Sequence, residues 1–147
     1  MNNEKINSEK RLTEEEQKFL YNLAVKNFKT GSYRRALPVF QFLVMEDNRN
    51  FIYLKSLAAC YHALNDYWLA LITYEQCLDF NSVDSLECNY YIGMCYFELA
   101  SYASAKTAFQ SFLDGSPNND AFEKKAKLFL DAIEQMDAHE AEVEEVL

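Results

Sequence analysis

The chain of 147 residues repeats itself three times, and this repetition constrains its fold more than any other feature. Read from Leu20, Leu54 and Asn89, the three copies align almost without gaps at offsets of 34 and 35 residues. In each copy an apolar residue is followed by a small residue, a turn residue and a tyrosine; these columns are Leu23, Leu57, Ile92; Ala24, Ala58, Gly93; Gly31, Asn65, Ala100; and Tyr33, Tyr67, Tyr102. A period of about 34 residues is typical of a helix–turn–helix repeat, so each copy is expected to form a pair of antiparallel helices.

The second helix of each pair has packing columns of its own. They hold an alanine and, one turn later, an aromatic residue; the members are Ala36, Ala70, Ala105 and Phe40, Tyr74, Phe109. A spacing of three to four residues places such side chains on one helical face. Pro38 aligns with Ile72 and Thr107, so it is expected inside this helix rather than in a loop, where it would bend the helix slightly.

These columns resemble those of the tetratricopeptide repeat. The resemblance implies an all-α fold in which three repeats supply six antiparallel helices in a right-handed superhelix. A C-terminal capping helix is expected to follow, because its apolar residues keep helical spacing and the last pair of a stack needs a cover. The chain is expected to divide into three parts: a flexible N-terminal segment at 1–12, a repeat domain at 13–138 and an acidic tail at 139–147. Within the repeat domain, the three repeats are expected at about 17–50, 51–84 and 86–119, and the capping helix at about 120–136.

Short motifs mark the helix ends. Thr13 and Glu16 form a capping box ahead of the first helix, and Asp84 with Glu87 is expected to repeat it ahead of the third pair. Asn65 and Ala100 replace the glycine of the first turn. Asparagine tolerates the conformation of a turn glycine well, and alanine at position 100 is tolerated if the turn stays right-handed. The tail carries five acidic residues and no Lys or Arg in its last eleven positions, so it is expected to fray.

Composition limits the classes of function. Three Gly and two Pro among 147 residues favour helices over sheets. A net charge of −9 opposes binding to nucleic acid and direct binding to anionic membranes. With no secretory signal or membrane-spanning run, the chain is expected inside the cell. The four cysteines contain no C-x-x-C pair and are expected to be buried thiols; no spacing indicates a metal, a cofactor or an enzyme's nucleophile.

The first helices of such repeats line the concave surface of the stack. Side chains expected there are mostly aromatic or aliphatic, which disfavours a clamp for acidic peptide ends and suits an extended apolar peptide. The interior is assigned to the columns that begin with Leu23 and Phe40, and the alternative is that the groove aromatics pack between helices instead. The predicted groove residues are Tyr21, Val25, Phe28, Tyr33, Ile52, Lys55, Ala59, His62, Tyr67, Tyr90, Met94 and Phe97.

The first repeat also resembles the opening repeat of the class II chaperones of type III secretion, the LcrH/SycD-like family. The shared motifs are Leu20-Tyr21, Leu23-Ala24, Phe28, Gly31-Ser32-Tyr33, Ala36 and Phe40-Gln41, with Leu57–Cys60 and Gly93–Leu99 in the later repeats. The resemblance implies a cytoplasmic bacterial chaperone that holds an extended segment of a hydrophobic translocator protein in its groove. It carries over Tyr21, Phe28 and Tyr33 as groove aromatics, with His62 and Tyr67 from the less closely matching second repeat.

Two other functions remain open for this fold. It would also serve a tetratricopeptide adaptor or a co-chaperone for needle subunits of a secretion apparatus.

The family often has a longer N-terminal arm that takes part in dimerisation, whereas the segment ahead of the first repeat is short and polar here. The chain is therefore expected to be able to form a homodimer, but its sequence does not predict the dimer interface.

Overall fold

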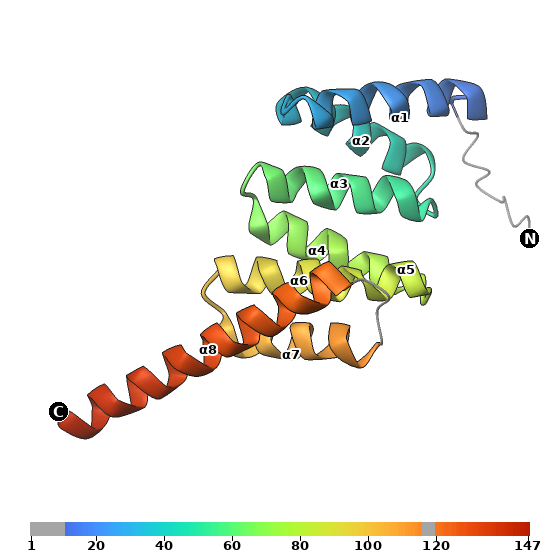
Figure 1. The fold of residues 1–147 in the computed structure, drawn as a ribbon. Coiled ribbons are helices and arrows are strands. Elements are labelled where there is room, and N and C mark those ends of the chain that lie inside the picture. The colour runs from blue at the N-terminus through green and yellow to red at the C-terminus, as the bar shows by residue number, and fades with distance from the viewer. Residues whose placement is uncertain (1–10, 116–119) are drawn as a thin grey trace, which may run out of the picture.

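The computed structural model describes residues 11–115 and 120–147, and within them all regular secondary structure is α-helical. The predicted all-α fold of three helix pairs and a C-terminal helix is confirmed, with one added helical turn, α5, ahead of the third pair (Figure 1). The helices in chain order are α1 (Glu14–Lys29), α2 (Tyr33–Glu46), α3 (Phe51–Ala63), α4 (Tyr67–Leu78), α5 (Val83–Leu86), α6 (Cys88–Glu98), α7 (Tyr102–Asp114) and α8 (Asp120–Val146).

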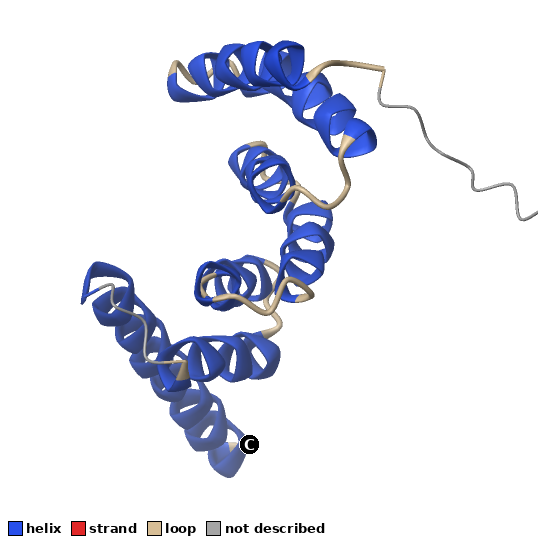
Figure 2. Ribbon diagram, turned by 90° about the vertical axis from the view of Figure 1, so that its right-hand side faces the viewer, coloured by secondary structure: helices blue, strands red, loops and turns tan. Residues whose placement is uncertain are grey.

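The helix pairs form a curved stack in which each pair packs against the next. The first helices, α1, α3 and α6, lie on the concave side, which faces the viewer in Figure 1 and points left in Figure 2. The second helices, α2, α4 and α7, form the convex side. α8 packs against α7 and closes the end of the stack. This arrangement places the apolar faces of neighbouring pairs against one another, as a repeat architecture requires.

Small residues let the two helices of a pair approach closely. Ala24 and Ala58 are fully buried, and Gly93 is buried in the same column. A Cβ added at Gly93 would lie 2.7 Å from the ring of Phe109, so α6 and α7 meet where a methyl group does not fit. The columns of the second helices are buried too: Ala36, Ala70, Ala105, Phe40, Tyr74 and Phe109.

Leu23 does not belong to the core, and its assignment to the interior was wrong. Its side chain is 43% exposed, whereas Leu57 and Ile92 in the same column are 7% and 4% exposed. This column faces the preceding helix pair in the stack. α1 has no preceding pair among the described residues, so Leu23 lies on an uncovered face.

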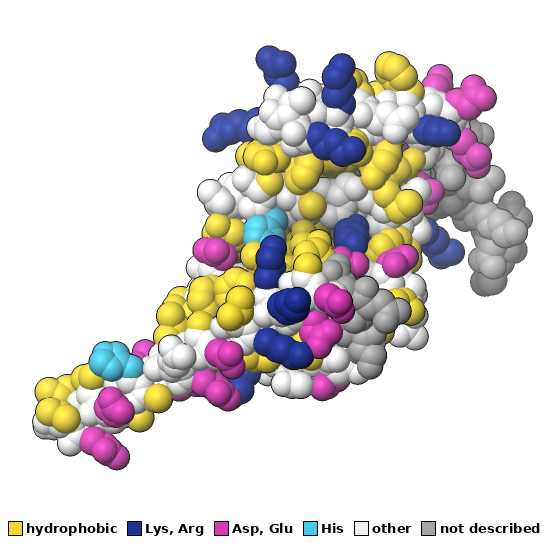
Figure 3. All heavy atoms as spheres, viewed as in Figure 1, with side chains coloured by type: hydrophobic (Ala, Val, Ile, Leu, Met, Phe, Trp, Pro, Cys, Tyr) yellow, Lys and Arg dark blue, Asp and Glu magenta, His cyan; other side chains and the backbone are white. Residues whose placement is uncertain are grey.

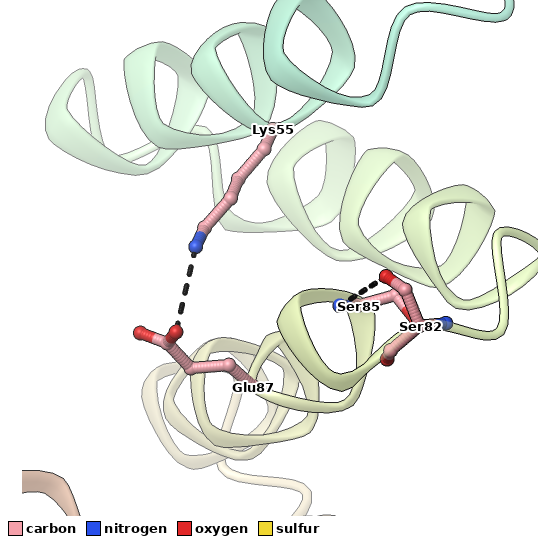
Figure 4. Close-up of polar contacts among 4 residues, drawn as sticks. All are labelled: Lys55, Ser82, Ser85 and Glu87. Atoms are coloured by element: carbon pink, nitrogen blue, oxygen red, sulfur yellow. Dashed lines mark hydrogen bonds and ion pairs between the residues drawn. The ribbon is translucent and has the colours of Figure 1, made fainter. Parts of the chain in front are cut away.

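The cap of α1 is confirmed, and the predicted cap ahead of the third pair is wrong. Thr13 Oγ1 accepts a hydrogen bond from the Glu16 N–H at 3.2 Å, and the Thr13 N–H donates to Glu16 Oε2 at 2.8 Å. Ahead of the third pair the reciprocal bonds join Ser82 and Ser85 (Figure 4). Asp84 lies inside α5 instead, because the helical turn starts two residues earlier than the sequence indicated.

The turn of each pair has the same left-handed geometry. Gly31, Asn65 and Ala100 have φ angles of 77°, 61° and 56°. In all three turns the next residue's N–H donates to a carbonyl five residues back, as in a Schellman cap; the bonds are Ser32 to Asn27, Asp66 to Tyr61 and Ser101 to Tyr96. The right-handed turn that would suit Ala100 is therefore not what the structure has, because the cap geometry imposes the positive φ on whichever residue stands there.

Pro38 lies inside α2, as predicted, at its sixth residue. It is exposed, whereas Ala36 and Phe40 on either side of it are buried. The backbone bond that its ring removes is therefore near the solvent side of the helix, where water can satisfy the carbonyl. The slight bend expected at this position stays a prediction.

α8 is longer than the sequence predicted. It was expected to end near residue 136, but it continues to Val146 and includes most of the stretch expected to fray (Figure 1). Its first half packs on the stack through Ala126 and Ile133, and every residue after Ile133 is exposed. Residues 1–10 of the predicted flexible segment lie outside the described residues. Within 11–115 and 120–147, no helix is both long and apolar enough to cross a membrane.

Candidate functional site

A small apolar hollow opens on the concave face between α1 and α3. It has a volume of about 190 Å³ and is lined by Tyr21, Val25, Phe28, Phe40, Ser56 and Ala59. The α1 side supplies large side chains at helical spacing, and the α3 side supplies two small ones, Ser56 and Ala59, which leave the space open. The hollow has room for one aliphatic side chain of a bound peptide.

A second hollow continues from the first along α3. It measures about 380 Å³ and is lined by Tyr21, Phe51, Ile52, Lys55, Ser56, Ala59 and Asp84. The two hollows share Tyr21, Ser56 and Ala59. Together they form the groove, a continuous apolar depression that Figure 3 shows as hydrophobic surface between α1 and α3. An extended peptide along it would place side chains on both sides of Tyr21.

The ring of Tyr21 is held in place by its neighbours. Its centroid lies 5.5 Å from that of Tyr53 and 6.1 Å from that of Phe40. Its hydroxyl lies 3.4 Å from Ser56 Oγ, within hydrogen-bonding distance across the groove. A ring fixed by packing and a hydrogen bond loses little conformational entropy when a ligand contacts it, which favours binding.

One charged pair lies at the edge of the apolar groove. Lys55 Nζ is 3.7 Å from Glu87 Oε2, which links α3 to the residue just before α6 (Figure 4). The same ammonium lies 5.9 Å from the ring centroid of Phe51 and 5.8 Å from that of Tyr91. These contacts hold Lys55 beside the second hollow, where its remaining N–H groups can donate to carbonyls of a bound peptide.

His62 and Tyr67 are placed between the second and third repeats rather than in the two hollows. The His62 ring lies 5.6 Å from the Tyr67 ring, and its Nδ1 is 3.9 Å from Cys95 Sγ. Burial lowers the pKa of His62 despite the opposing effect of Glu98, so the imidazole is neutral at pH 7. Tyr67 donates a hydrogen bond to Asn65 Oδ1 at 2.9 Å and supports the turn.

Tyr33 lies outside both hollows as well. Its ring contacts Phe28 edge-on at 5.1 Å, and its carbonyl accepts a hydrogen bond from Cys60 Sγ at 3.3 Å. It therefore supports Phe28 from the start of α2. The residue-by-residue match to the family placed it in the groove, but the structure gives it this supporting position.

Tyr90 was expected in the groove, but α8 covers it. It is 3% exposed, and its ring stacks on that of Phe122 with 4.6 Å between centroids. Phe97 packs edge-on against Phe129 at 5.0 Å. The alternative of packing between helices is thus correct for Tyr90, because the capping helix lies over the first helix of the last repeat.

A third hollow of about 470 Å³ remains between α6 and α8. Met94 and Phe97 line it with residues of α8, and the full lining is Tyr90, Met94, Phe97, Lys125, Leu128, Phe129 and Ala132. Sequence reasoning missed the α8 side of this hollow. It also missed Phe51 and Ser56, although Ser56 lies at helical spacing from Ile52 and Ala59 and could have been found from that signal.

The chemistry of the described residues centres on apolar contact. Burial raises the pKa of the Cys60 thiol to about 11 and that of Cys95 to about 12, so both are protonated at neutral pH. All four cysteines are free and buried. Across 11–115 and 120–147, no cluster of three His, Cys, Asp or Glu side chains could hold a metal ion.

The chain resembles solved structures of secretion chaperones, although no family model and no curated protein matches it. PcrH of Pseudomonas aeruginosa, solved in complex with the chaperone binding region of PopD, is 25% identical with a TM-score of 0.75, over 87% of this chain and 98% of PcrH. The Yersinia enterocolitica type III secretion chaperone SycD, solved with a peptide of the translocator YopD, is 22% identical with a TM-score of 0.75, over 86% of this chain and 98% of SycD.

A tetratricopeptide domain from a fungus shares the same fold. The tetratricopeptide domain of Sgt2 from Aspergillus fumigatus is 21% identical with a TM-score of 0.74, over 86% of this chain and 83% of that domain. The tetratricopeptide fold and the resemblance to class II chaperones of type III secretion are both confirmed by these structures. The functional assignment depends on the groove.

Proposed function

We propose that the chain is a cytoplasmic chaperone of type III secretion that binds an extended apolar segment of a translocator protein in its concave groove. The observation that carries this proposal is the continuous apolar depression with Tyr21 at its centre. Two of the similar structures contain partner segments, the chaperone binding region of PopD and a peptide of the translocator YopD, which supports a cargo of this class here.

The groove would protect its cargo by removing apolar side chains from water. Each Å² of apolar surface buried in this way contributes about 25 cal/mol to the free energy of binding. Two side chains anchored in the hollows would therefore both strengthen the binding of the cargo. Ser56 and Ala59 leave the space, and Tyr21 separates the two anchors. The net charge of −9 keeps the complex soluble while the cargo's apolar segment is held.

Co-expression with candidate translocators encoded near the gene tests the proposal. A translocator should be recovered with the chain in pull-down and should become soluble in its presence. The double variant Tyr21→Ala, Phe28→Ala should lose the cargo while its helical circular dichroism stays unchanged. The control is Trp68→Ala, which removes an exposed ring from α4 on the convex side and should bind cargo normally.

One result would contradict the proposal, and a second would require a separate test of the groove. Capture of a needle-type subunit and no translocator would favour the alternative, an adaptor or needle-subunit co-chaperone with the same fold. Unfolding of the double variant would instead show that the two rings are structural. In that case Ala59→Leu, which adds bulk without removing a packed ring, tests the groove separately.

A further inference from the structure

The Lys55–Glu87 pair at the edge of the groove has hydrogen-bonding capacity that the fold does not use. The ammonium and the carboxylate point toward each other at 3.7 Å, which suits an ion pair but is too long for a hydrogen bond (Figure 4). Neither group is hydrogen bonded to another residue in the part of the chain that the structure describes. The ammonium therefore keeps its N–H donors, and the carboxylate keeps its acceptors, for a further partner.

Both side chains have a defined place in the free chain. Less than a third of either side chain is exposed, at 30% for Lys55 and 28% for Glu87. The ammonium lies near the rings of Phe51 and Tyr91, and Glu87 stands at the junction of α5 and α6. Groups that are already held in position lose little conformational entropy when they bind a ligand.

The main chain of an extended peptide matches this pair. In a β-strand the N–H and the C=O of one residue point to the same side, as the paired hydrogen bonds of antiparallel strands show. A carboxylate can accept from that N–H while a neighbouring ammonium donates to that C=O. The two roles cannot be exchanged, because a carboxylate donates no hydrogen bond and an ammonium accepts none. Such a pair therefore fixes the N-to-C direction of the peptide that it binds.

The position of the pair fits the same geometry. The side chains of an extended peptide point roughly perpendicular to the direction of its main-chain hydrogen bonds. A groove that receives side chains in hollows must therefore contact the main chain from its edge. Lys55 lines the second hollow, and Glu87 faces it from the start of α6 (Figure 4). The pair thus lies where the main chain of a segment anchored in this hollow would pass.

We infer that Lys55 and Glu87 form a main-chain clamp, in which Lys55 Nζ donates to the C=O of one cargo residue and the Glu87 carboxylate accepts from the N–H of the same residue. This inference rests on the proposed function and adds a contact that sets the register and direction of the bound segment. The hollows select side chains, and the clamp binds the main chain, as in other modes of extended-peptide recognition. Proline cannot occupy the clamped position, because it has no N–H.

Calorimetric titration of two clamp variants is the first test. The probe is the synthetic segment of the co-expressed translocator that the wild-type chain protects from proteolysis. Lys55→Met and Glu87→Met remove the polar groups and keep side chains of similar length. Each should raise the Kd about tenfold, as expected for the loss of a hydrogen bond to a charged group. The matched controls are Lys106→Met and Glu134→Met, which break a 4.0 Å ion pair between α7 and α8 away from the hollows and should leave the Kd unchanged.

Changes in the peptide backbone distinguish a clamp from a pair that only supports the fold. Methylation of the clamped residue's nitrogen should weaken binding to the wild-type chain and have much less effect on Glu87→Met. Replacing the peptide bond after the same residue by an ester weakens its C=O as an acceptor, so it should weaken binding to the wild-type chain but not to Lys55→Met. A double-mutant cycle isolates this coupling, and a scan along the segment should assign both effects to one residue.

Two results would overturn the clamp and leave the proposed function intact. One is normal binding of the segment by both clamp variants, with their helical circular dichroism unchanged. The other is a backbone scan in which each substitution has the same effect on the wild-type chain and on the clamp variants. Failure of the wild-type chain to bind any translocator segment would instead refute the proposed function, and the clamp with it.

Discussion

Filling the smaller hollow without disturbing the core is the sharpest perturbation of the groove. Ala59 contributes to the walls of both hollows, and the smaller one has a volume of about 190 Å³. Ala59→Leu adds three carbon atoms from the α3 side and occupies the space that a cargo side chain would take. The residue is partly exposed in the free chain, so the larger side chain has room at the surface.

The expected effect on affinity follows from the burial that is lost. A cargo leucine or valine that can no longer enter the hollow forfeits about 1.5–3 kcal/mol of transfer free energy. Because about 1.4 kcal/mol corresponds to a tenfold change, the Kd should rise by roughly 10- to 100-fold. Alanine and leucine differ little in helix propensity, so the free energy of unfolding should change by only a few tenths of a kcal/mol, roughly.

Calorimetric titration with the purified cargo segment measures the change in Kd, and thermal denaturation followed by circular dichroism measures stability. The matched control is Ala103→Leu, the same substitution at an exposed position of α7 that lines none of the hollows described above. It should change neither quantity. An unchanged Kd for Ala59→Leu, with unchanged stability, would refute the assignment of the hollow as a cargo site.

Three further predictions concern the scaffold. Gly93→Ala should lower stability by about 1–3 kcal/mol, because its Cβ would lie 2.7 Å from the Phe109 ring; urea denaturation measures the loss. Ala100→Gly should raise stability by up to about 1 kcal/mol in the same assay, because glycine adopts a φ of 56° without strain, partly offset by a more flexible unfolded chain. Burial lowers the pKa of His62 below its ordinary value of 6.5. The neutral imidazole therefore contributes fully to the stability of the fold above pH 6.5, and this contribution declines as the pH falls below 6.5. Thermal denaturation of His62→Gln should therefore depend less on pH between about 7 and 5 than that of the wild type.

The features that the sequence predicted well are those that one repeat determines by itself. The close approach at Ala24 and Ala58 follows from residue size, and the helix pair follows from the spacing of apolar positions. The capping box at Thr13 was predictable for the same reason, since all its atoms lie within four residues. Such signals are local, so three aligned copies reinforce one another.

The features that the sequence misplaced depend on what lies next to a repeat in the stack. Leu23 occupies a core column but sits where no described pair precedes it. Tyr90 occupies a groove column but is covered by Phe122 of α8. The spacing of apolar residues in α8 predicted a capping helix, but it did not indicate which face of the third repeat that helix covers. An alignment of the repeats treats all three copies alike. It therefore cannot show that a column is uncovered in the first helix pair of the stack or covered by α8 in the last.

The cover that α8 provides also locates the most accessible part of the groove. With Tyr90 stacked under Phe122, the concave surface of the third repeat is reduced to the hollow beside Leu128. The two contiguous hollows around Tyr21 lie instead beside α3, and the larger one extends from Tyr21 of α1 to Asp84 of α5. For the proposed function we expect a bound segment to have apolar side chains at two nearby positions that flank Tyr21, with its carbonyls within reach of Lys55. Cargo segments with a single apolar residue should bind far more weakly than those with two, because one hollow would then stay empty.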